Sequence, residues 1–361
     1  MNIKKEENVF VTEINKARAE GKKVIVLGGA LGAVRIVNGL KFKGLDADAF
    51  AVDKEYYEPG RKLMDKDVLC LDDLDPAGCI IIRSIANYPK KEELNGRFHV
   101  IDEDVQSLSM VSGDPFDLVF FEANSDKFNT IFESLSDEKS KTVMTSFINQ
   151  KITGRFSEMA DIWDEIQYFD CDFYDISSVD CIVDCGAYDG DSFLSFCNEY
   201  KKSTGKDYEG EGYLLDPDHT NQEKIKERFR NSPATVHAME MGAWDESGTL
   251  SFDTDGNIGN SGKISDHGSM SIKVEAIDNM LSGKKADFIK MDIEGAELNA
   301  LKGAEKTIKE YHPILAVCAY HKREDLIELT DYIKSLYSGY RFFVRAYGGP
   351  YSIELVLYAV A

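Results

Sequence analysis

The stretch Cys181-Ile-Val-Asp-Cys-Gly-Ala-Tyr-Asp-Gly-Asp-Ser192 decides the fold. Its first five residues are an apolar run typical of a buried strand, and the chain from Ser192 onward favours a helix. Between them, Gly186 and Gly190 allow positive φ and a close approach of the backbone to a ligand. Asp184 puts a carboxylate at the strand end, which suits a ligand with an ammonium or hydroxyl group. The stretch predicts a ligand-binding turn between a strand and a helix.

Strand and helix patterns alternate from residue 179 to the end of the chain. Apolar strands alternating with helices indicate a mostly parallel sheet covered on both faces. The expected strands are 181–185, 212–216, 235–239, 249–253, 271–276, 287–291, 314–320, 340–346 and 353–360, and the expected helices are 192–202, 220–231, 297–311 and 324–336.

Residues 341–360 depart from this alternation. Two strand-like runs are joined by Gly348-Gly-Pro350, which leaves no room for a crossover helix and predicts an antiparallel hairpin. Such a hairpin distinguishes the sheet of S-adenosylmethionine-dependent methyltransferases from that of dinucleotide dehydrogenases. The predicted fold class is α/β, with a Rossmann-like class I methyltransferase domain, a mostly parallel seven-stranded sheet ending in a C-terminal antiparallel hairpin, preceded by a smaller α/β domain.

Residues 24–53 repeat the strand, glycine turn, helix and strand pattern in a weaker form. The second strand ends in Asp53, as in nucleotide-binding βαβ units. However, Ala30 and Ala33 stand where the dinucleotide motif has glycine, so a structural unit and a nucleotide site both remain open. A helix at 2–20, strands at 78–83 and 116–121, and a helical region at 125–168 complete this half of the chain.

These patterns predict three parts. An N-terminal Rossmann-like α/β domain covers residues 1–124, a helical connector covers 125–170, and the methyltransferase domain covers 171–361. The first part is expected to bind a nucleotide-linked substrate, to position the acceptor or to mediate a homo-oligomer, and the sequence does not choose among these roles.

Composition excludes several classes of protein. The 361 residues carry a formal charge of −22 and 43% hydrophobic residues, so a folded, acidic protein is expected. Its surface repels nucleic acid and anionic membranes. The seven cysteines form no metal-binding pattern and are expected to be reduced and mostly buried thiols. With no signal peptide and no membrane span in the sequence, a cytoplasmic location is expected.

The carboxyl ends of the strands hold the candidate ligand-binding residues, because ligands of open α/β sheets bind there. Asp216 ends the second strand, where an acidic residue holds a ribose diol. Asp218 or Thr220 is better placed to cap the next helix. The candidate cofactor-binding residues are Asp184, Gly186, Ala187, Tyr188, Gly190, Ser192, Asp216, Asn221, Gly242, Ala243, Trp244 and Asp292.

Three further positions leave alternatives open. The small pair Gly242-Ala243 beside Trp244 forms either a slot for a flat adenine ring or ordinary core packing. Asp292 and Glu294 follow the fourth strand and act as general base, bind a cation or cap a helix. His321 follows the fifth strand as a proton acceptor or a helix cap. The candidate catalytic residues are Asp292, His321 and Glu294, and no metal ligand is assigned.

Four segments resemble the FkbM family of S-adenosylmethionine-dependent methyltransferases. The resemblance covers about residues 165–361, and Asp216 departs from it, since relatives often carry glutamate there. The run around Ser140 and Gln167-Tyr-Phe169 resembles members with an N-terminal extension. The four segments are Val183-Asp-Cys-Gly-Ala-Tyr-Asp-Gly-Asp-Ser192, Leu215-Asp-Pro-Asp218, Phe288-Ile-Lys-Met-Asp-Ile-Glu-Gly-Ala-Glu297, which is the most specific, and Pro313-Ile-Leu-Ala-Val-Cys-Ala-Tyr-His-Lys322.

This resemblance implies O-methylation of a hydroxyl on a sugar, a glycan or another small molecule, with S-adenosyl-L-methionine as cofactor. Asp292 or His321 is then the expected base. Two other classes stay open: an oxidoreductase that uses NAD at the N-terminal βαβ unit, and a non-catalytic protein that binds the nucleotide or the cofactor.

Overall fold

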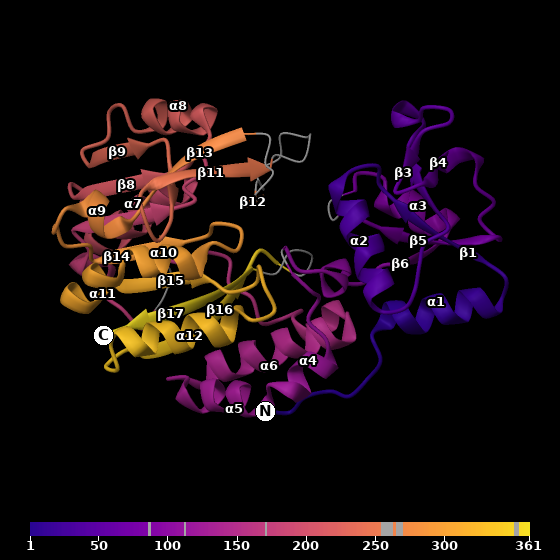
Figure 1. Ribbon diagram of the computed structural model, residues 1–361, viewed down its shortest axis with the longest axis horizontal. Coiled ribbons are helices and arrows are strands. Elements are labelled where there is room, and N and C mark those ends of the chain that lie inside the picture. The colour runs from indigo at the N-terminus through magenta and orange to yellow at the C-terminus, as the bar shows by residue number, and fades with distance from the viewer. Residues whose placement is uncertain (86–87, 112, 170–171, 254–262, 265–269, 350–353) are drawn as a thin grey trace. The chain divides into compact units, whose positions relative to one another are not determined.

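The computed structural model describes residues 1–85, 88–111, 113–169, 172–253, 263–264, 270–349 and 354–361 (Figure 1). The chain divides into two compact units. The first consists mainly of Met1–Ser125 and Thr142–Ile162, and the second of Asp126–Lys141, Trp163–Gly348 and Glu354–Ala361. Each unit is described by itself below.

The second unit is built on a seven-stranded sheet in the order β16-β17-β15-β14-β7-β8-β9. Strand β17 runs antiparallel to both of its neighbours, and the other neighbours are parallel. The predicted fold class and its C-terminal hairpin are therefore confirmed. The strands are β7 (Cys181–Cys185), β8 (Glu211–Leu215), β9 (Thr235–Met239), β14 (Phe288–Met291), β15 (Ile314–Cys318), β16 (Arg341–Tyr347) and β17 (Glu354–Val360).

The order of these strands places a switch point between β7 and β14. From β7 the chain builds outward through β8 and β9, and it then returns to place β14 on the other side of β7. Ligands of open α/β sheets bind at such a point, beyond the carboxyl ends of the strands. A ligand-binding site is therefore expected at the turns that follow β7 and β14.

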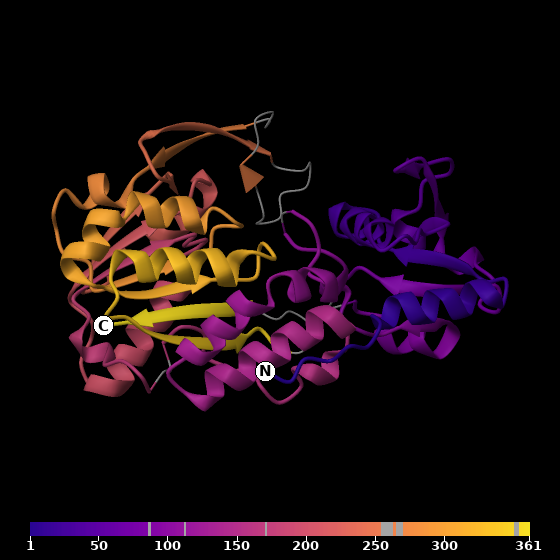
Figure 2. The same cartoon turned by 60° about the horizontal axis from the view of Figure 1, so that its bottom comes forward.

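Helices cover both faces of this sheet. On one face, Phe169 lies 5.4 Å from Phe196 and 5.4 Å from Phe288 between ring centroids, and all three rings are buried. Burying a ring of this size stabilises the fold by about 2–3 kcal/mol. Figures 1 and 2 show α10 and α12 running beside each other along the sheet. The helices are α5 (Ser125–Ser134), α7 (Asp191–Thr204), α8 (His219–Arg228), α9 (Ile277–Leu281), α10 (Glu297–Gly303), α11 (Glu305–Tyr311) and α12 (Asp325–Leu336), with a 3-10 turn η5 (Ile176–Ser178).

Two predicted features of this unit differ in the structure. The helix expected at 297–311 is broken, because a Cβ atom at Gly303 would lie 1.9 Å from the carbonyl oxygen of Trp244, so the backbones touch where the helix is interrupted. The strands expected at 249–253 and 271–276 do not join the main sheet. They belong to a separate four-stranded sheet, which consists of β10 (Gly242–Ala243), β13 (Met270–Glu275), β11 (Gly248–Asp253) and β12 (Lys263–Ile264).

The first unit holds a six-stranded sheet in the order β3-β4-β2-β1-β5-β6, parallel except for the pair β3 and β4. The expected βαβ pattern is confirmed as β1, α2 and β2. Its elements are α1 (Val9–Ala19), β1 (Lys23–Leu27), α2 (Leu31–Phe42), β2 (Ala49–Val52), β3 (Lys62–Leu63), β4 (Lys66–Cys70), β5 (Cys79–Arg83), α3 (Lys91–Arg97), β6 (His99–Ile101) and α4 (Leu118–Ala123), with 3-10 turns η1 (Lys54–Tyr56), η2 (Leu71–Asp73), η3 (Val105–Leu108) and η4 (Phe156–Glu158). Helix α6 (Glu138–Thr153) contains the division between the units.

The strand predicted at 116–121 is wrong, because these residues begin helix α4. The carboxylate of Asp117 accepts a hydrogen bond of 2.8 Å from the backbone N–H of Phe120 and caps the helix. An apolar run of six residues does not by itself separate a strand from a buried helix. Similarly, α1 begins at Val9 and not at residue 2, because Asn8 caps it.

The cysteines of the described residues form no disulfide bonds. The six described cysteines are free thiols, and all but Cys197 are buried. Cys171 lies outside the described residues. Within the described part of the chain, no helix has the length and apolar character needed to cross a membrane.

A buried ion pair ties α6 to the sheet within the second unit. Arg345 of β16 is 4% exposed, and its Nη2 lies 2.6 Å from Oδ2 of Asp137. The guanidinium also donates to the hydroxyl of Ser140 at 2.9 Å. Burial alone would raise the pKa of Asp137, but Arg345 and Ser140 outweigh it and lower this pKa to about 2.

We expect Arg345→Met to lower the free energy of unfolding by about 2 kcal/mol at pH 7. The pKa of Asp137 is lowered in the folded state, so its contribution exists above the ordinary value of 3.8 and is lost as pH falls towards 2. The difference between wild type and variant in urea unfolding should therefore shrink between about pH 4 and pH 2. Arg341→Met, at an exposed position of the same strand, is the control and should change stability by less than about 0.5 kcal/mol. Equal effects of the two variants would contradict the assignment.

Candidate functional site

The turn after β7 needs its glycines for contacts within the protein. Gly186 has φ +79°, and a Cβ atom there would lie 1.9 Å from the carbonyl oxygen of Asp292, in the turn after β14. Gly190 has φ +83° at the N-cap of α7, and a Cβ atom would lie 2.6 Å from the ring of Phe229. The two turns at the switch point are thus in direct backbone contact. Ala187 is buried in this turn, and Ser192 lies in the first turn of α7.

Asp216, directly after β8, holds the same turn from the other side. Its Oδ2 accepts a hydrogen bond of 3.0 Å from the backbone N–H of Tyr188, and its Oδ1 accepts from the N–H of Asp218 at 2.9 Å and from Nδ2 of Asn221 at 3.1 Å. A carboxylate offers about four acceptor positions. Within the described part of the chain, Oδ2 therefore has one position left for a ligand hydroxyl. Burial raises the pKa of Asp216.

Helix α8 also fixes this turn. Asp218 caps α8 by accepting a hydrogen bond of 3.0 Å from the N–H of Asn221, which confirms the cap expected for this acid. Arg228, in the last turn of α8, makes two hydrogen bonds of 2.9 and 2.7 Å to Asp189. The ammonium of Lys224 lies 5.2 Å from the ring of Tyr188, which has φ +48°. These contacts hold the turn in place before any ligand binds.

Asp184 lies below the turn and not at its open edge. It is 1% exposed, and its Oδ1 lies 3.0 Å from Nζ of Lys290 on β14. Lys290 also donates a hydrogen bond of 2.8 Å to the carbonyl oxygen of Gly186. Burial alone would lower the pKa of Lys290, but Asp184 and Asp292 outweigh it and raise this pKa. The ion pair thus links the turn to β14. The sequence did not predict this buried position of Asp184.

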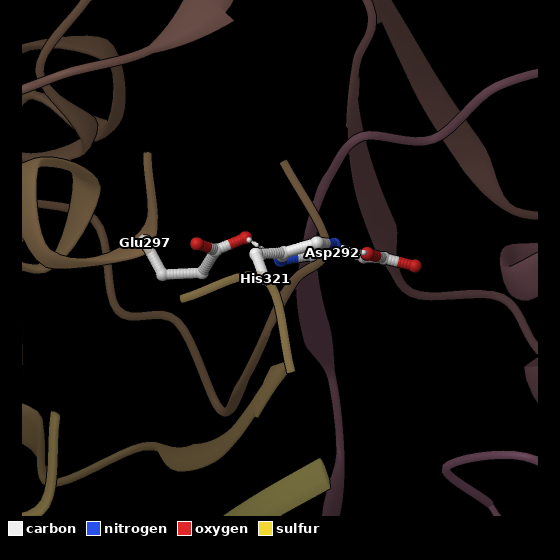
Figure 3. A group of neighbouring side chains, drawn as sticks. All are labelled: Asp292, Glu297 and His321. Carbon is white, nitrogen blue, oxygen red and sulfur yellow. Dashed lines mark ion pairs between the residues drawn. The ribbon is translucent and has the colours of Figure 1, made fainter. Parts of the chain in front are cut away.

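Asp292, His321 and Glu297 form a second cluster at this edge (Figure 3). Nε2 of His321 lies 3.4 Å from Oδ1 of Asp292, and Nδ1 lies 2.9 Å from Oε1 of Glu297. His321 and Glu297 are buried, whereas the side chain of Asp292 is 25% exposed. Asp292 also accepts hydrogen bonds from the hydroxyls of Tyr320 at 3.2 Å and Tyr168 at 3.4 Å.

The charges in this cluster reinforce each other. Burial alone would lower the pKa of His321, but Glu297 and Asp292 raise it well above its ordinary value. Burial alone would raise the pKa of Asp292, but His321 and Lys290 hold it below its ordinary value. Two carboxylates beside one buried imidazole thus favour its protonated form. This argues against the proton-acceptor role predicted for His321.

The geometry of the cluster favours an ionic bridge over a metal site. In Figure 3 the imidazole lies between the two carboxylates. Each ring nitrogen lies nearest to a different carboxylate, so the imidazole bridges the two acids, while one ligand atom from each of the three residues lies within 4.8 Å of the others. Glu294, the other acid considered for a cation, lies in the adjacent turn with φ +59° and is partly exposed.

The structure leaves the role of the Gly242-Ala243 pair open. Gly242 and Ala243 form β10 of the small sheet and pair with β13. Trp244 follows, partly exposed, and its backbone N–H donates a hydrogen bond of 3.0 Å to Glu275. An adenine slot at this place stays a prediction.

Sequence reasoning missed the two tyrosines, Lys290 and the contact of Glu297 with His321. Lys290 carried a usable signal, because a lysine inside the apolar run Phe288-Ile-Lys-Met291 must find a buried acid. Tyr168 carried none, since its place at the end of the expected helical region 125–168 does not indicate which strand end it reaches. Its contact with Asp292 arises only from the tertiary fold.

The strand order with its C-terminal antiparallel hairpin defines the fold of the second unit as the Rossmann-like fold of methyltransferases. The family model of the methyltransferase FkbM domain matches residues 184–344 of this chain. The chain therefore contains an FkbM-family methyltransferase domain, as the sequence resemblance predicted.

Two known proteins are similar to this chain. The crystal structure of methyltransferase FkbM from Methylobacillus flagellatus KT superposes with a TM-score of 0.69 at 21% identity, covering 96% of this chain and 92% of that one, so the fold is shared. Hexuronic acid methyltransferase AglP from Haloferax volcanii is 29% identical over 107 residues. This match spans 28% of the present chain and 45% of AglP, less than half the length of that relative.

The contact between the two turns predicts a strong effect at one glycine. We expect Gly186→Ala to lower the free energy of unfolding by more than about 3 kcal/mol, because the new methyl group meets the Asp292 carbonyl and φ is positive. Gly205→Ala is the matched control, since Gly205 also has positive φ but has nothing within 4 Å of the added Cβ atom. Gly205→Ala should lower the free energy of unfolding by only about 1 kcal/mol. Urea unfolding measures both, and equal losses would show that the close approach is unimportant.

Proposed function

We propose that this protein transfers a methyl group from S-adenosylmethionine to a hydroxyl group of a sugar or glycan. The observation that carries the proposal is the acceptor position left on Asp216 beside the glycine turn, at the switch point of the sheet. A carboxylate at this place suits one hydroxyl of a ribose. The FkbM domain match supports methyl transfer as the reaction class.

The residues around the turn fit such a cofactor. Asp216 offers a charged acceptor on a carboxylate already oriented by three donors, so little ordering remains to be done on binding. Together with Asp216, Asn221 and Tyr188 form the proposed cofactor wall. Lys224 contacts Tyr188, and Arg228 holds the turn through Asp189. Asp184 acts from below, through Lys290 and the Gly186 carbonyl.

Bound S-adenosylmethionine supplies a methyl group on a positively charged sulfur, and its transfer to a hydroxyl yields a methyl ether, S-adenosylhomocysteine and one proton. Asp292 is our candidate to receive that proton. Its side chain is the most exposed of its cluster, and its Oδ2 accepts a hydrogen bond of 3.4 Å from the Tyr168 hydroxyl. The lowered pKa makes Asp292 a weak base. Its main contribution is therefore to orient the hydroxyl by accepting its hydrogen bond.

A sugar acceptor is supported by the similarity to AglP, whose name describes a hexuronic acid methyltransferase. We extend this substrate class to the present chain as part of the proposal. A uronic acid offers two kinds of oxygen, a hydroxyl and a carboxylate. A hydroxyl must lose its proton during methyl transfer, whereas a carboxylate has none to lose. A residue such as Asp292 is therefore needed only when the acceptor is a hydroxyl.

The N-terminal βαβ unit gives less support to an NAD-dependent reaction. A Cβ atom at Gly28 would lie 2.1 Å from Oγ of Ser84, so this glycine is needed for packing. Oδ1 of Asp53 already accepts hydrogen bonds from Tyr88 at 2.8 Å and Lys90 at 3.0 Å. Stabilisation by S-adenosylmethionine and not by NAD in a thermal-shift assay is the result that fits our proposal.

We expect Asp216→Asn to weaken S-adenosylmethionine binding about 10- to 100-fold in calorimetry, because a charged hydrogen bond to the cofactor is lost. Asp218→Asn is the control, since Asp218 lies two residues away and its side chain caps α8. The affinity of Asp218→Asn for S-adenosylmethionine should stay within about threefold of wild type, because asparagine caps a helix as well as aspartate does. Unchanged affinity in Asp216→Asn, with a folded protein by circular dichroism, would refute the ribose assignment.

The acceptor can be tested with the methyl α-glycosides of glucuronic acid and glucose and radiolabelled S-adenosylmethionine. We expect label to enter a methyl ether, which survives mild alkali, because the proposed acceptor is a hydroxyl. Asp292→Asn should then reduce turnover by about 10²-fold or more. Label released by alkali as methanol would instead identify a methyl ester and a carboxylate acceptor, and would remove the role proposed for Asp292.

A further inference from the structure

His321 is a fully buried histidine whose two ring nitrogens both face carboxylates. Glu297, its partner at Nδ1, is also buried, so the pair is closed to solvent. Neither ring nitrogen makes an aligned hydrogen bond among the described residues. Proton transfer along the three groups needs aligned hydrogen bonds, whereas electrostatic attraction at 2.9 and 3.4 Å does not.

Glu297 connects the histidine to the backbone of the turn after β14. Its Oε1 accepts a hydrogen bond of 2.9 Å from the N–H of Ile293 and a second, at 3.4 Å, from the N–H of Gly295. The same oxygen is the one nearest to His321. One carboxylate therefore fixes both the turn that carries Asp292 and the cation that faces Asp292.

We propose that Glu297 and His321 are positioning residues for Asp292: Glu297 holds a buried imidazolium, and the imidazolium keeps Asp292 ionised and oriented at the edge of the sheet. The catalytic use of Asp292 rests on the proposed function, but the ionic arrangement does not. The pair places two charges in the protein interior, which is unfavourable for the free energy of folding. Removing one partner destabilises the fold further, because the remaining buried charge is left unpaired.

Other charged and titratable groups also face this cluster. From β14, Lys290 stabilises the Asp292 anion, and from β17, Glu354 opposes it. From α12, Asp325 lies near Glu297, and burial together with Glu297 raises the pKa of Asp325 to about 7. The remaining titratable neighbours, Tyr168, Cys318 and Tyr320, keep their protons at neutral pH, since burial raises the pKa of each.

The first test reads the charge of His321 directly in the wild-type protein. With ¹⁵N-labelled histidine, and His321 assigned by comparison with His321→Gln, both ring nitrogens should stay protonated from about pH 6 to about pH 8. In Glu297→Gln the ring should lose a proton within this range, because its main anionic partner is gone. A neutral His321 ring at pH 7 in wild type would overturn the proposal.

The second test reads Asp292. With ¹³C-labelled aspartate, and the signal assigned by comparison with Asp292→Asn, the carboxyl midpoint should rise by about one pH unit or more in His321→Gln, because the neighbouring cation is removed. His237→Gln is the matched control, since His237 of β9 lies 3.3 Å from Glu211 of β8 in a partly exposed pair. It should leave the Asp292 midpoint unchanged. An identical midpoint in wild type and His321→Gln would overturn the proposal.

Binding measurements separate this inference from the proposed function. S-adenosylmethionine affinity should stay within about threefold of wild type in Glu297→Gln, because Glu297 acts through His321 on Asp292 and not on the cofactor wall. With the glucuronide acceptor, kcat should fall about tenfold or more while KM for S-adenosylmethionine changes little. If wild type binds no S-adenosylmethionine while both NMR results hold, the proposed function fails and the ionic arrangement stands.

Discussion

The contact on which the rest of the site depends is the backbone approach of Gly186 to the carbonyl oxygen of Asp292. It brings the turn after β7 against the turn after β14, and Lys290 reinforces it by donating to the Gly186 carbonyl while it neutralises Asp184. A larger residue at 186 would force the two turns apart. The glycine that first suggested close contact with a ligand is therefore needed for a contact inside the protein, and this contact brings Asp292 to the turn where the cofactor is proposed to bind.

Three carboxylates in this unit show how environment divides similar side chains into different roles. Asp216 is surrounded by neutral donors, and we propose that its remaining acceptor position binds a hydroxyl. Asp184, of the same chemical type and one strand away, is closed off by an ammonium group. Asp292 stands between these cases, partly exposed and paired with a cation. Charge partners and exposure, more than residue type, decide what each acid can do.

Much of the architecture was predictable because it follows from local pattern. The missing crossover before residue 353 required an antiparallel strand, and the apolar runs required a sheet covered on both faces. The site was predictable only as a list of strand ends. Which acid receives Lys290, and that His321 points inward to Glu297, depends on register and packing, which one sequence does not reveal. The helix at 118–123 was missed because a single capping aspartate outweighed an apolar run.

The position of β17 also bears on when this unit is completed during synthesis. β17 lies between β15 and β16, both of which precede it in the chain, and β16 has no other neighbour in the sheet. A ribosome makes the chain from its N-terminus, so β16 emerges before β17, its neighbour in the sheet, and until then its backbone can pair only with the earlier segment at Leu135 and Ser136. Until then, five strands of the main sheet can assemble while the sixth cannot join them. The nascent chain must therefore keep an exposed β16 from pairing with other chains at this stage.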